Sequence, residues 1–167
     1  MGSSTRHLVL KRIEQSVEVS AKPSQVWTVV SDLPRMSEWS PQVWRSFVRG
    51  GVRGGSPGAG RIGAGTRLLN VNRRGLLVWP TRSTVVRFEE GREIAWRIKD
   101  NGSIWSFVLE PSGSGTRLVQ RRDVPDGIHE SSLALTDRLL GGQPAFQAEL
   151  QAGMRQTLAR IKQTVEG

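Results

Sequence analysis

Two polar residues, Gln120 and Arg122, lie at alternate positions along one predicted strand, residues 116–123. Side chains of a strand point alternately to its two faces, so if Leu118 faces inward, Gln120 and Arg122 face inward too. An inward guanidinium can bind a ligand carboxylate or phenolate through paired N–H donors. It can equally reach solvent or an internal carboxylate, and the sequence leaves these hypotheses for Arg122 open.

Asn70 and Asn72 repeat this pattern on a second predicted strand, where they share a face with Thr66 and Leu68. A period of two therefore puts two amides on the side of the strand that also carries apolar residues. Amide groups in that place can hydrogen-bond a bound molecule. The two asparagines are thus further candidates for contact with a ligand.

Residues for catalysis or metal binding are few. The chain has two histidines, His7 and His129, and neither cysteine nor tyrosine. A histidine-based metal site, a cysteine nucleophile or a catalytic triad therefore lacks members. Asp32 and Glu38 lie near two predicted short helices, and Asp32 suits a helix end better than proton transfer. We predict no catalytic, cofactor-binding or metal-ligating residues and no cofactor.

The segment from residue 13 to residue 39 predicts a strand followed by two short helices. Residues 13–20 alternate in the manner of a half-buried strand. Pro23 suits the first position of a helix, and Ser20 or Ser24 can cap its free amides. A second short helix then brings Trp39 to the point where Pro41 turns the chain back toward strand.

The middle of the chain predicts six more strands separated by turn signals. Asn101-Gly102 is the strongest of these signals, because a two-residue hairpin turn needs positive φ at both positions. Such short connections join antiparallel neighbours. The predicted strands are residues 42–49, 66–73, 76–88, 93–99, 103–110 and 116–123.

The end of the chain predicts a long amphipathic helix over residues 145–165, after a weaker helix at 131–140. Its apolar stripe needs a large partner, and a curved antiparallel sheet is the one available. Gly153, near its middle, permits either close packing on the sheet or space for a ligand. The stripe consists of Phe146, Leu150, Met154, Leu158, Ile161 and Val165.

This order of elements resembles the START-like helix-grip superfamily, also called SRPBCC, and in particular its polyketide cyclase/dehydrase and lipid-transport branch. The matching segments are Val17 to Trp27, Ser31-Asp32, Trp39-Ser40-Pro41, Gly63 to Thr66, Ile94-Ala95-Trp96, Trp105 to Pro111, Gly115 to Leu118 and Gly153-Met154.

The resemblance implies an α+β helix-grip fold. Its seven-stranded curved antiparallel sheet has two short helices after the first strand, and a long C-terminal helix covers a cavity. We expect one START-like domain over residues 1–167, with a flexible tail at 1–7 and a glycine-rich loop at 50–65.

We expect ten residues to line this cavity and bind the ligand: Trp39, Trp96, Trp105, Phe107, Gln120, Arg122, Phe146, Leu150, Met154 and Leu158. The expected function is binding or carrying a small hydrophobic ligand such as a lipid, a fatty acid or a polyketide-like aromatic. One alternative is a polyketide aromatase/cyclase, which can act largely by folding its substrate. Another is a basic accessory protein that binds nucleic acid or a protein partner.

The formal net charge of +9 is the observation behind that last alternative. However, the basic residues are dispersed, with no run longer than a pair such as Arg73-Arg74, which disfavours nucleic-acid binding. No apolar run is long enough for a membrane span, and the first residues lack the apolar core of a secretory signal. We therefore expect a cytoplasmic protein, either a monomer or a homodimer.

Overall fold

The computed structural model of the chain describes residues 11–50, 62–126 and 143–167. Several predicted features lie outside these ranges. They are the tail at 1–7, most of the glycine-rich loop at 50–65, the weaker helix at 131–140 and both histidines.

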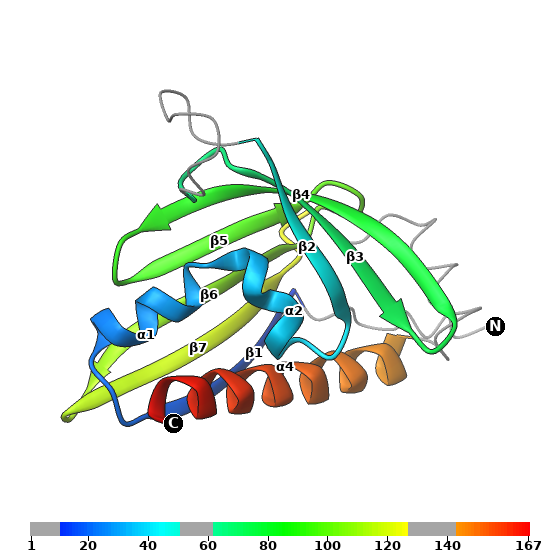
Figure 1. The fold of residues 1–167 in the computed structure, drawn as a ribbon. Coiled ribbons are helices and arrows are strands. Elements are labelled where there is room, and N and C mark those ends of the chain that lie inside the picture. The colour runs from blue at the N-terminus through cyan, green and yellow to red at the C-terminus, as the bar shows by residue number, and fades with distance from the viewer. Residues whose placement is uncertain (1–10, 51–61, 127–142) are drawn as a thin grey trace.

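A seven-stranded sheet dominates the fold (Figure 1), and all of its neighbouring strands are antiparallel. The strand order is β1-β7-β6-β5-β4-β3-β2, so β1 pairs with the last strand and every other strand pairs with its neighbours in sequence. The predicted α+β helix-grip fold is confirmed. The strands are β1 (Arg12–Val19), β2 (Val43–Gly50), β3 (Arg67–Arg74), β4 (Leu77–Glu89), β5 (Glu93–Ile98), β6 (Ile104–Ser112) and β7 (Gly115–Asp123).

Helices cover one side of the curved sheet. Three short ones connect β1 to β2: α1 (Pro23–Val30), the 3₁₀ helix η1 (Leu33–Arg35) and α2 (Met36–Trp39). The long C-terminal helix α4 (Gln143–Glu166) runs beside β1, and both α1 and α2 contact it (Figure 1). None of the helices in the described residues is both long and apolar enough to cross a lipid bilayer.

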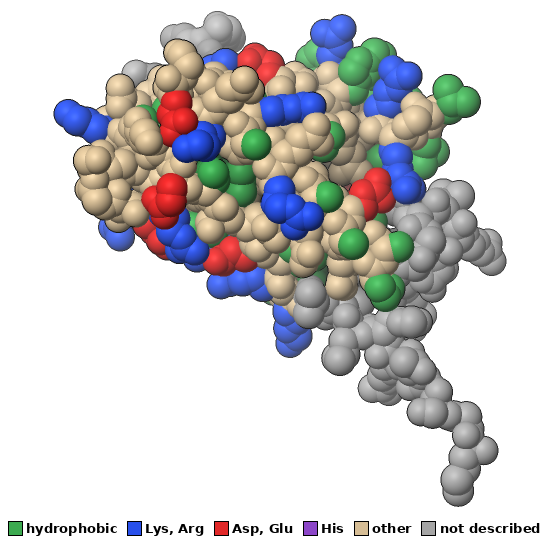
Figure 2. All heavy atoms as spheres, turned by 90° about the horizontal axis from the view of Figure 1, so that it is seen from below, with side chains coloured by type: hydrophobic (Ala, Val, Ile, Leu, Met, Phe, Trp, Pro, Cys, Tyr) green, Lys and Arg blue, Asp and Glu red, His purple; other side chains and the backbone are tan. Residues whose placement is uncertain are grey.

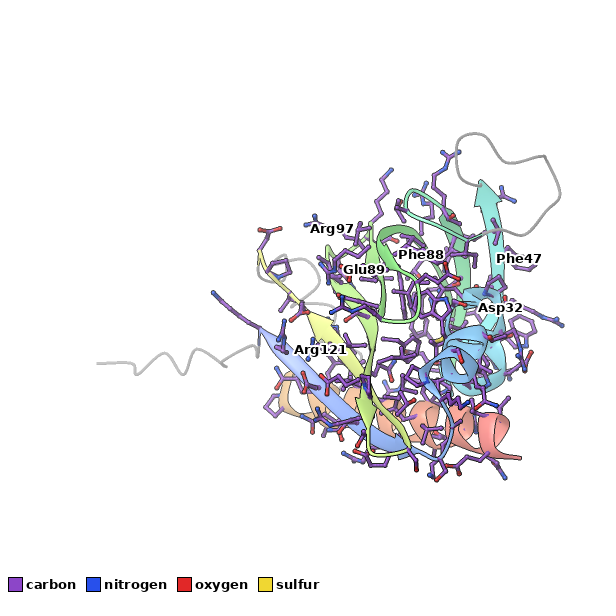
Figure 3. The ribbon with its side chains drawn as sticks, turned by 90° about the vertical axis from the view of Figure 1, so that its left-hand side faces the viewer. Asp32, Phe47, Phe88, Glu89, Arg97 and Arg121 are labelled. Carbon is purple, nitrogen blue, oxygen red and sulfur yellow. The ribbon has the colours of Figure 1, made fainter. Side chains whose placement is uncertain are left out.

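The predicted serine cap of α1 is wrong. Because Pro23 occupies the first helical position, the residue before it, Lys22, is the N-cap. Gln25 supports this helix start, since its side-chain oxygen accepts the Lys22 backbone N–H at 3.0 Å. Asp32 lies, as predicted, at a helix end, where it precedes η1 at the surface (Figure 3).

The hydrophobic core lies between the inner face of the sheet and the helices. Leu158 and Ile161 of α4 are fully buried against residues of α1 and the central strands. Ring contacts tie the layers together: Trp27 of α1 meets Phe88 of β4 edge-on, with ring centroids 5.3 Å apart. The predicted stripe of α4 therefore faces the sheet, and most of its polar positions are exposed or half-buried, except Thr157, which is buried and donates to the Gly153 carbonyl.

The outer surface carries ion pairs rather than one basic block. Arg121 of β7 bonds Glu14 of β1 at 2.6 Å, and Arg12 bonds Asp123 at 2.7 Å. On the face seen in Figure 2, Lys and Arg side chains lie among Asp and Glu side chains. The charge of this face is therefore distributed, in line with the dispersed basic residues of the sequence.

Gly115 begins β7 at a point where the backbones of β7 and β1 come very close. A Cβ added there would overlap the carbonyl oxygen of Val19. We expect Gly115→Ala to lower the free energy of unfolding by about 1–3 kcal/mol, because the backbone must move to admit the methyl group. Chemical denaturation measures this loss. Ser114→Ala, in the same turn and exposed, is the control, and equal denaturation midpoints for the two variants would contradict the expected overlap.

Candidate ligand-binding cavity

A cavity of about 790 Å³ lies between the inner face of the sheet and the first half of α4. Strands β3 to β7 supply one wall, and α2 and α4 supply the other. The lining mixes aromatic rings and methionine with polar and charged side chains in comparable number. A volume of this size is within the usual range for sites that hold small molecules.

Seven of the ten predicted ligand-binding residues line this cavity, and the periodicity of their elements explains why. β7 contributes alternate residues of its inner face, and α4 contributes residues spaced by four. The seven are Trp96, Trp105, Gln120, Arg122, Phe146, Leu150 and Met154.

The other three, Trp39, Phe107 and Leu158, do not line the cavity and are packed in the core, each exposing 1% or less of its surface. Phe107 packs on Trp96 with ring centroids 5.6 Å apart. Leu158 lies one turn beyond Met154, where residues of α1, η1 and α2 fill the space under the sheet. The short helices thus confine the cavity to one half of the interface between α4 and the sheet.

Further polar residues reach the cavity from β3 and β4. Asn70 accepts a hydrogen bond from the Ser46 hydroxyl at 2.6 Å, and the Asn72 amide donates to the Thr81 hydroxyl at 3.0 Å. Asn70 and Asn72 share the buried face that the alternation of β3 predicts. Thr81 was not singled out in the sequence, although its pairing with Asn70 across the two strands places it on the same face.

Arg122 is the unusual member of the lining, because only 5% of its surface is exposed. Its guanidinium lies 5.8 Å from the centre of the Phe146 ring, and no carboxylate in the described part of the chain pairs with it. Burial lowers the pKa of Arg122 to about 10, so it stays charged at neutral pH. A fall of this size corresponds to about 3 kcal/mol of lost solvation.

Gln120 lies two residues before Arg122 on the same face of β7 and is also buried. Its side-chain carbonyl oxygen has no hydrogen-bond partner within the described residues. An unsatisfied buried acceptor costs about 1–3 kcal/mol. One end of the cavity therefore holds both a charge and an amide oxygen, neither of which has a partner in the part of the chain that the structure describes.

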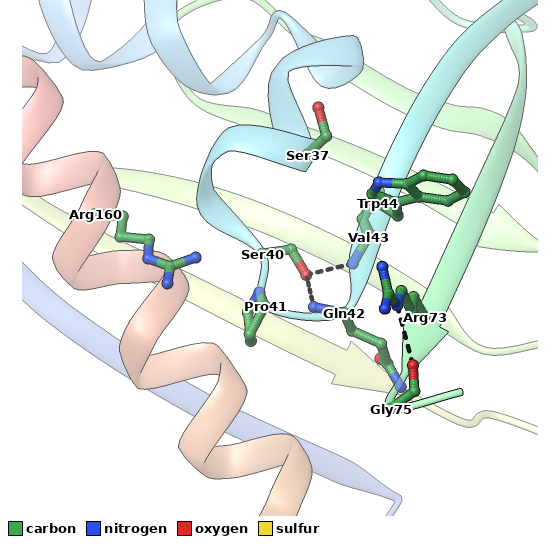
Figure 4. Close-up of a pocket in the computed structure, with 9 residues that line it drawn as sticks. All are labelled: Ser37, Ser40, Pro41, Gln42, Val43, Trp44, Arg73, Gly75 and Arg160. Atoms are coloured by element: carbon green, nitrogen blue, oxygen red, sulfur yellow. Dashed lines mark hydrogen bonds between the residues drawn. The ribbon is translucent and has the colours of Figure 1, made fainter. Parts of the chain in front are cut away.

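A smaller and more open groove of about 510 Å³ adjoins the cavity (Figure 4), and six residues line both. Its polar groups are largely used within the protein. The Ser40 hydroxyl accepts the Val43 backbone N–H at 3.3 Å, and Arg73 donates to the Gly75 carbonyl at 3.0 Å. Because it is smaller and lacks an unpaired buried charge, we take the larger cavity as the candidate site. The shared residues are Ser40, Pro41, Gln42, Val43, Arg73 and Gly75.

Gly153 lines the cavity from α4, and the structure favours one of the two roles left open by the sequence. A Cβ added there would meet only the Pro41 ring, at 3.6 Å, which is an ordinary contact. Close packing therefore does not require glycine. The space beside the helix belongs to the cavity.

Gly153→Ala is expected to raise the free energy of unfolding by about 0.5–1 kcal/mol, because alanine is the better helix former and no clash opposes it. Thermal and chemical denaturation measure the gain. Ala152→Gly, at the exposed neighbouring position, is the matched control and should lower stability by a similar amount. A loss of stability in Gly153→Ala would mean that α4 packs more tightly here than described.

The family described as "Polyketide cyclase / dehydrase and lipid transport" has a sequence model that matches residues 11–166. The chain belongs to this family. Its helix-grip sheet and long last helix are those that the resemblance in sequence implied. A search of curated proteins with the sequence of this family member found no match.

Solved structures share the fold of this polyketide cyclase/dehydrase and lipid-transport family member. The di-domain ARO/CYC protein StfQ from the steffimycin biosynthetic pathway has a TM-score of 0.70 at 17% identity, over 93% of this chain and 50% of StfQ. The KanY protein (ms6282) has a TM-score of 0.65 at 17% identity, over 93% and 97% of the two chains. A START superfamily protein from Mycobacterium smegmatis has 0.62 at 16%, over 92% and 98%. At these identities the likeness concerns the fold alone.

Proposed function

We propose that this family member binds a small, largely apolar molecule in the cavity under its sheet. The cavity itself carries the proposal: about 790 Å³ of space with an extensive aromatic and aliphatic wall, which also carries polar side chains in comparable number. Such a lining favours an apolar body by removing it from water, at about 25 cal/mol per Å² of buried surface. A lipid, a fatty acid or a polyketide-like aromatic has the matching chemistry.

The flexible side chains of the wall support binding over transformation of the ligand. Met36 and Met154 face the cavity from α2 and α4, and unbranched thioethers adapt to ligands of different shapes. In the described residues the polar groups are spread over several strands, two connecting segments and α4 rather than arranged as a nucleophile with its base. We therefore propose a binder or carrier whose polar residues orient the ligand.

Native mass spectrometry of protein purified without detergent tests this function, together with fluorescence titration of the neutral probe N-phenyl-1-naphthylamine. We expect a bound small molecule or saturable probe uptake. Absence of both in folded protein would contradict the proposal.

A cavity-filling variant locates the binding site. Gly153→Leu places a side chain into the cavity and is expected to weaken probe binding at least about tenfold. Ala159→Leu adds the same side chain at an exposed position of α4 and should leave the affinity unchanged. Equal effects of the two variants would mean that the probe binds somewhere other than in this cavity.

A polyketide aromatase/cyclase is the second candidate. The family description names polyketide cyclases, and the di-domain ARO/CYC proteins StfQ and BexL share the fold, with TM-scores of 0.70 and 0.67. The amide N–H groups of Asn70 and Gln120 can donate to the carbonyls of a folded chain. Conversion of carrier-bound poly-β-ketones to a defined cyclic product would favour this function over binding alone. Recovery of only the spontaneous products would count against it.

A further inference from the structure

The guanidinium of Arg122 sits among apolar neighbours. Across the sheet, Arg122 is paired with Ile13 of β1 on one side and Trp105 of β6 on the other. From α4, the Phe146 ring lies 5.8 Å away. Ile13 and Trp105 belong to the same hydrophobic cluster as Phe146. The charge is therefore enclosed by groups that cannot compensate it as a carboxylate does.

Among the described residues, two carboxylates line the cavity, and both are engaged elsewhere. Glu149 bonds Arg74 at 2.9 Å, and Asp100 accepts the backbone N–H of Arg82 at 3.1 Å. Arg121, the residue before Arg122, shows the usual arrangement, since it pairs with Glu14 on the other face of β7 (Figure 3). Buried charges in proteins are ordinarily paired, so Arg122 departs from the pattern of its neighbours.

We propose that Arg122 is the anchor for the carboxylate of an amphipathic ligand, whose apolar body occupies the rest of the cavity. This assignment rests on the proposed binding function and names its ligand class. The planar fork of a guanidinium matches a carboxylate through two parallel N–H···O bonds. Gln120, next along the same face, adds an amide whose oxygen is unpaired and can accept a bond from a hydroxyl near the carboxylate.

The lining also sets the direction of the ligand. The charged end lies at Arg122 and Phe146, under β7, and the body extends past Trp96 and Met154 toward β3 and β4. An apolar molecule without the charge fits the same space but leaves Arg122 uncompensated. The anchor thus predicts a preference between molecules of equal length that differ only in their head group.

Displacement of bound N-phenyl-1-naphthylamine by dodecanoate and by methyl dodecanoate tests the anchor in wild-type protein. We expect dodecanoate to bind about tenfold to a hundredfold more tightly than its methyl ester, because a hydrogen bond to a charged group contributes that much. Equal affinities, with the probe still bound, would overturn the anchor and leave the proposed function standing. Failure of the probe and both ligands to bind would overturn both.

Three substitutions assign the preference to Arg122. In Arg122→Met the advantage of dodecanoate over the ester is expected to disappear. Arg122→Lys keeps the charge without the fork and should retain an intermediate preference. Arg121→Met, on the outer face, is the matched control and should keep the full preference. A full preference retained in folded Arg122→Met would overturn the assignment.

Discussion

Replacing Phe107 by alanine is expected to lower the free energy of unfolding by about 3–5 kcal/mol. The Phe107 side chain is fully buried on the inner face of β6 and packs on Trp96 at 5.6 Å between ring centroids. Removing it forfeits the burial of the ring and leaves a void, because close-packed neighbours relax only in part. For a chain of this size such a loss lowers the melting temperature by on the order of 10 °C.

Phe47→Ala is the matched control for this experiment. Phe47 is also on a strand, β2, but points outward and exposes 48% of its surface (Figure 3). Its truncation should cost less than about 1 kcal/mol, since most of the ring is already in water. Chemical denaturation of both variants, with urea midpoints and slopes, makes the comparison. Similar losses in the two would mean that Phe107 does not occupy the core position described here.

The fold was predictable because each element carries a periodic pattern of its own. Alternation along β1, β3 and β7, and the spacing of three or four along α4, fix which face of each element is buried. Once the faces are known, one sheet and one long helix have a single way to cover each other. Ser20 and Ser24 were the local failure, since the position of Pro23 and not the capping preference of serine determines where α1 begins.

The position of the cavity was less predictable than the face on which it lies. Periodicity places Phe107 and Trp105 on the same face of β6, yet Phe107 is in the core and Trp105 lines the cavity. Likewise Leu158 and Met154 share one stripe of α4 and have different surroundings. Core and cavity residues differ in whether α1, η1 and α2 extend under the sheet at their position. That extent depends on tertiary packing, and the pattern of an individual strand does not predict it.

The state of Arg122 illustrates the same limit. The sequence indicates its face but leaves open whether it reaches solvent, an internal carboxylate or a ligand. In the unliganded protein Arg122 is buried, so it does not reach solvent, and the described residues supply no internal carboxylate for it. Only the three-dimensional arrangement of the surrounding apolar groups distinguishes these cases.

Arg122→Met is expected to raise the stability of the unliganded protein by about 1–3 kcal/mol, because an apolar side chain of similar length replaces an uncompensated buried charge. The sign follows from the pKa. Burial in the folded state lowers the pKa of Arg122 from its ordinary value to about 10, so the charged form destabilises the folded state at neutral pH. That destabilisation diminishes only as the pH rises through about 10. Chemical denaturation at pH 7 measures the gain in the variant.

Dodecanoate should remove this difference in stability. A ligand that binds only the folded state stabilises it by about 2.7 kcal/mol at a hundredfold excess over its dissociation constant. If Arg122 is the anchor, the wild type receives this stabilisation and Arg122→Met receives less of it. The variant should therefore be the more stable protein without dodecanoate. In the presence of dodecanoate the advantage of the variant should vanish. Arg121→Met, which removes only the surface pair with Glu14, should change stability by less than about 1 kcal/mol in both conditions. Loss of stability in unliganded Arg122→Met would mean that the guanidinium is compensated inside the protein, and that its charge is not held ready for a ligand.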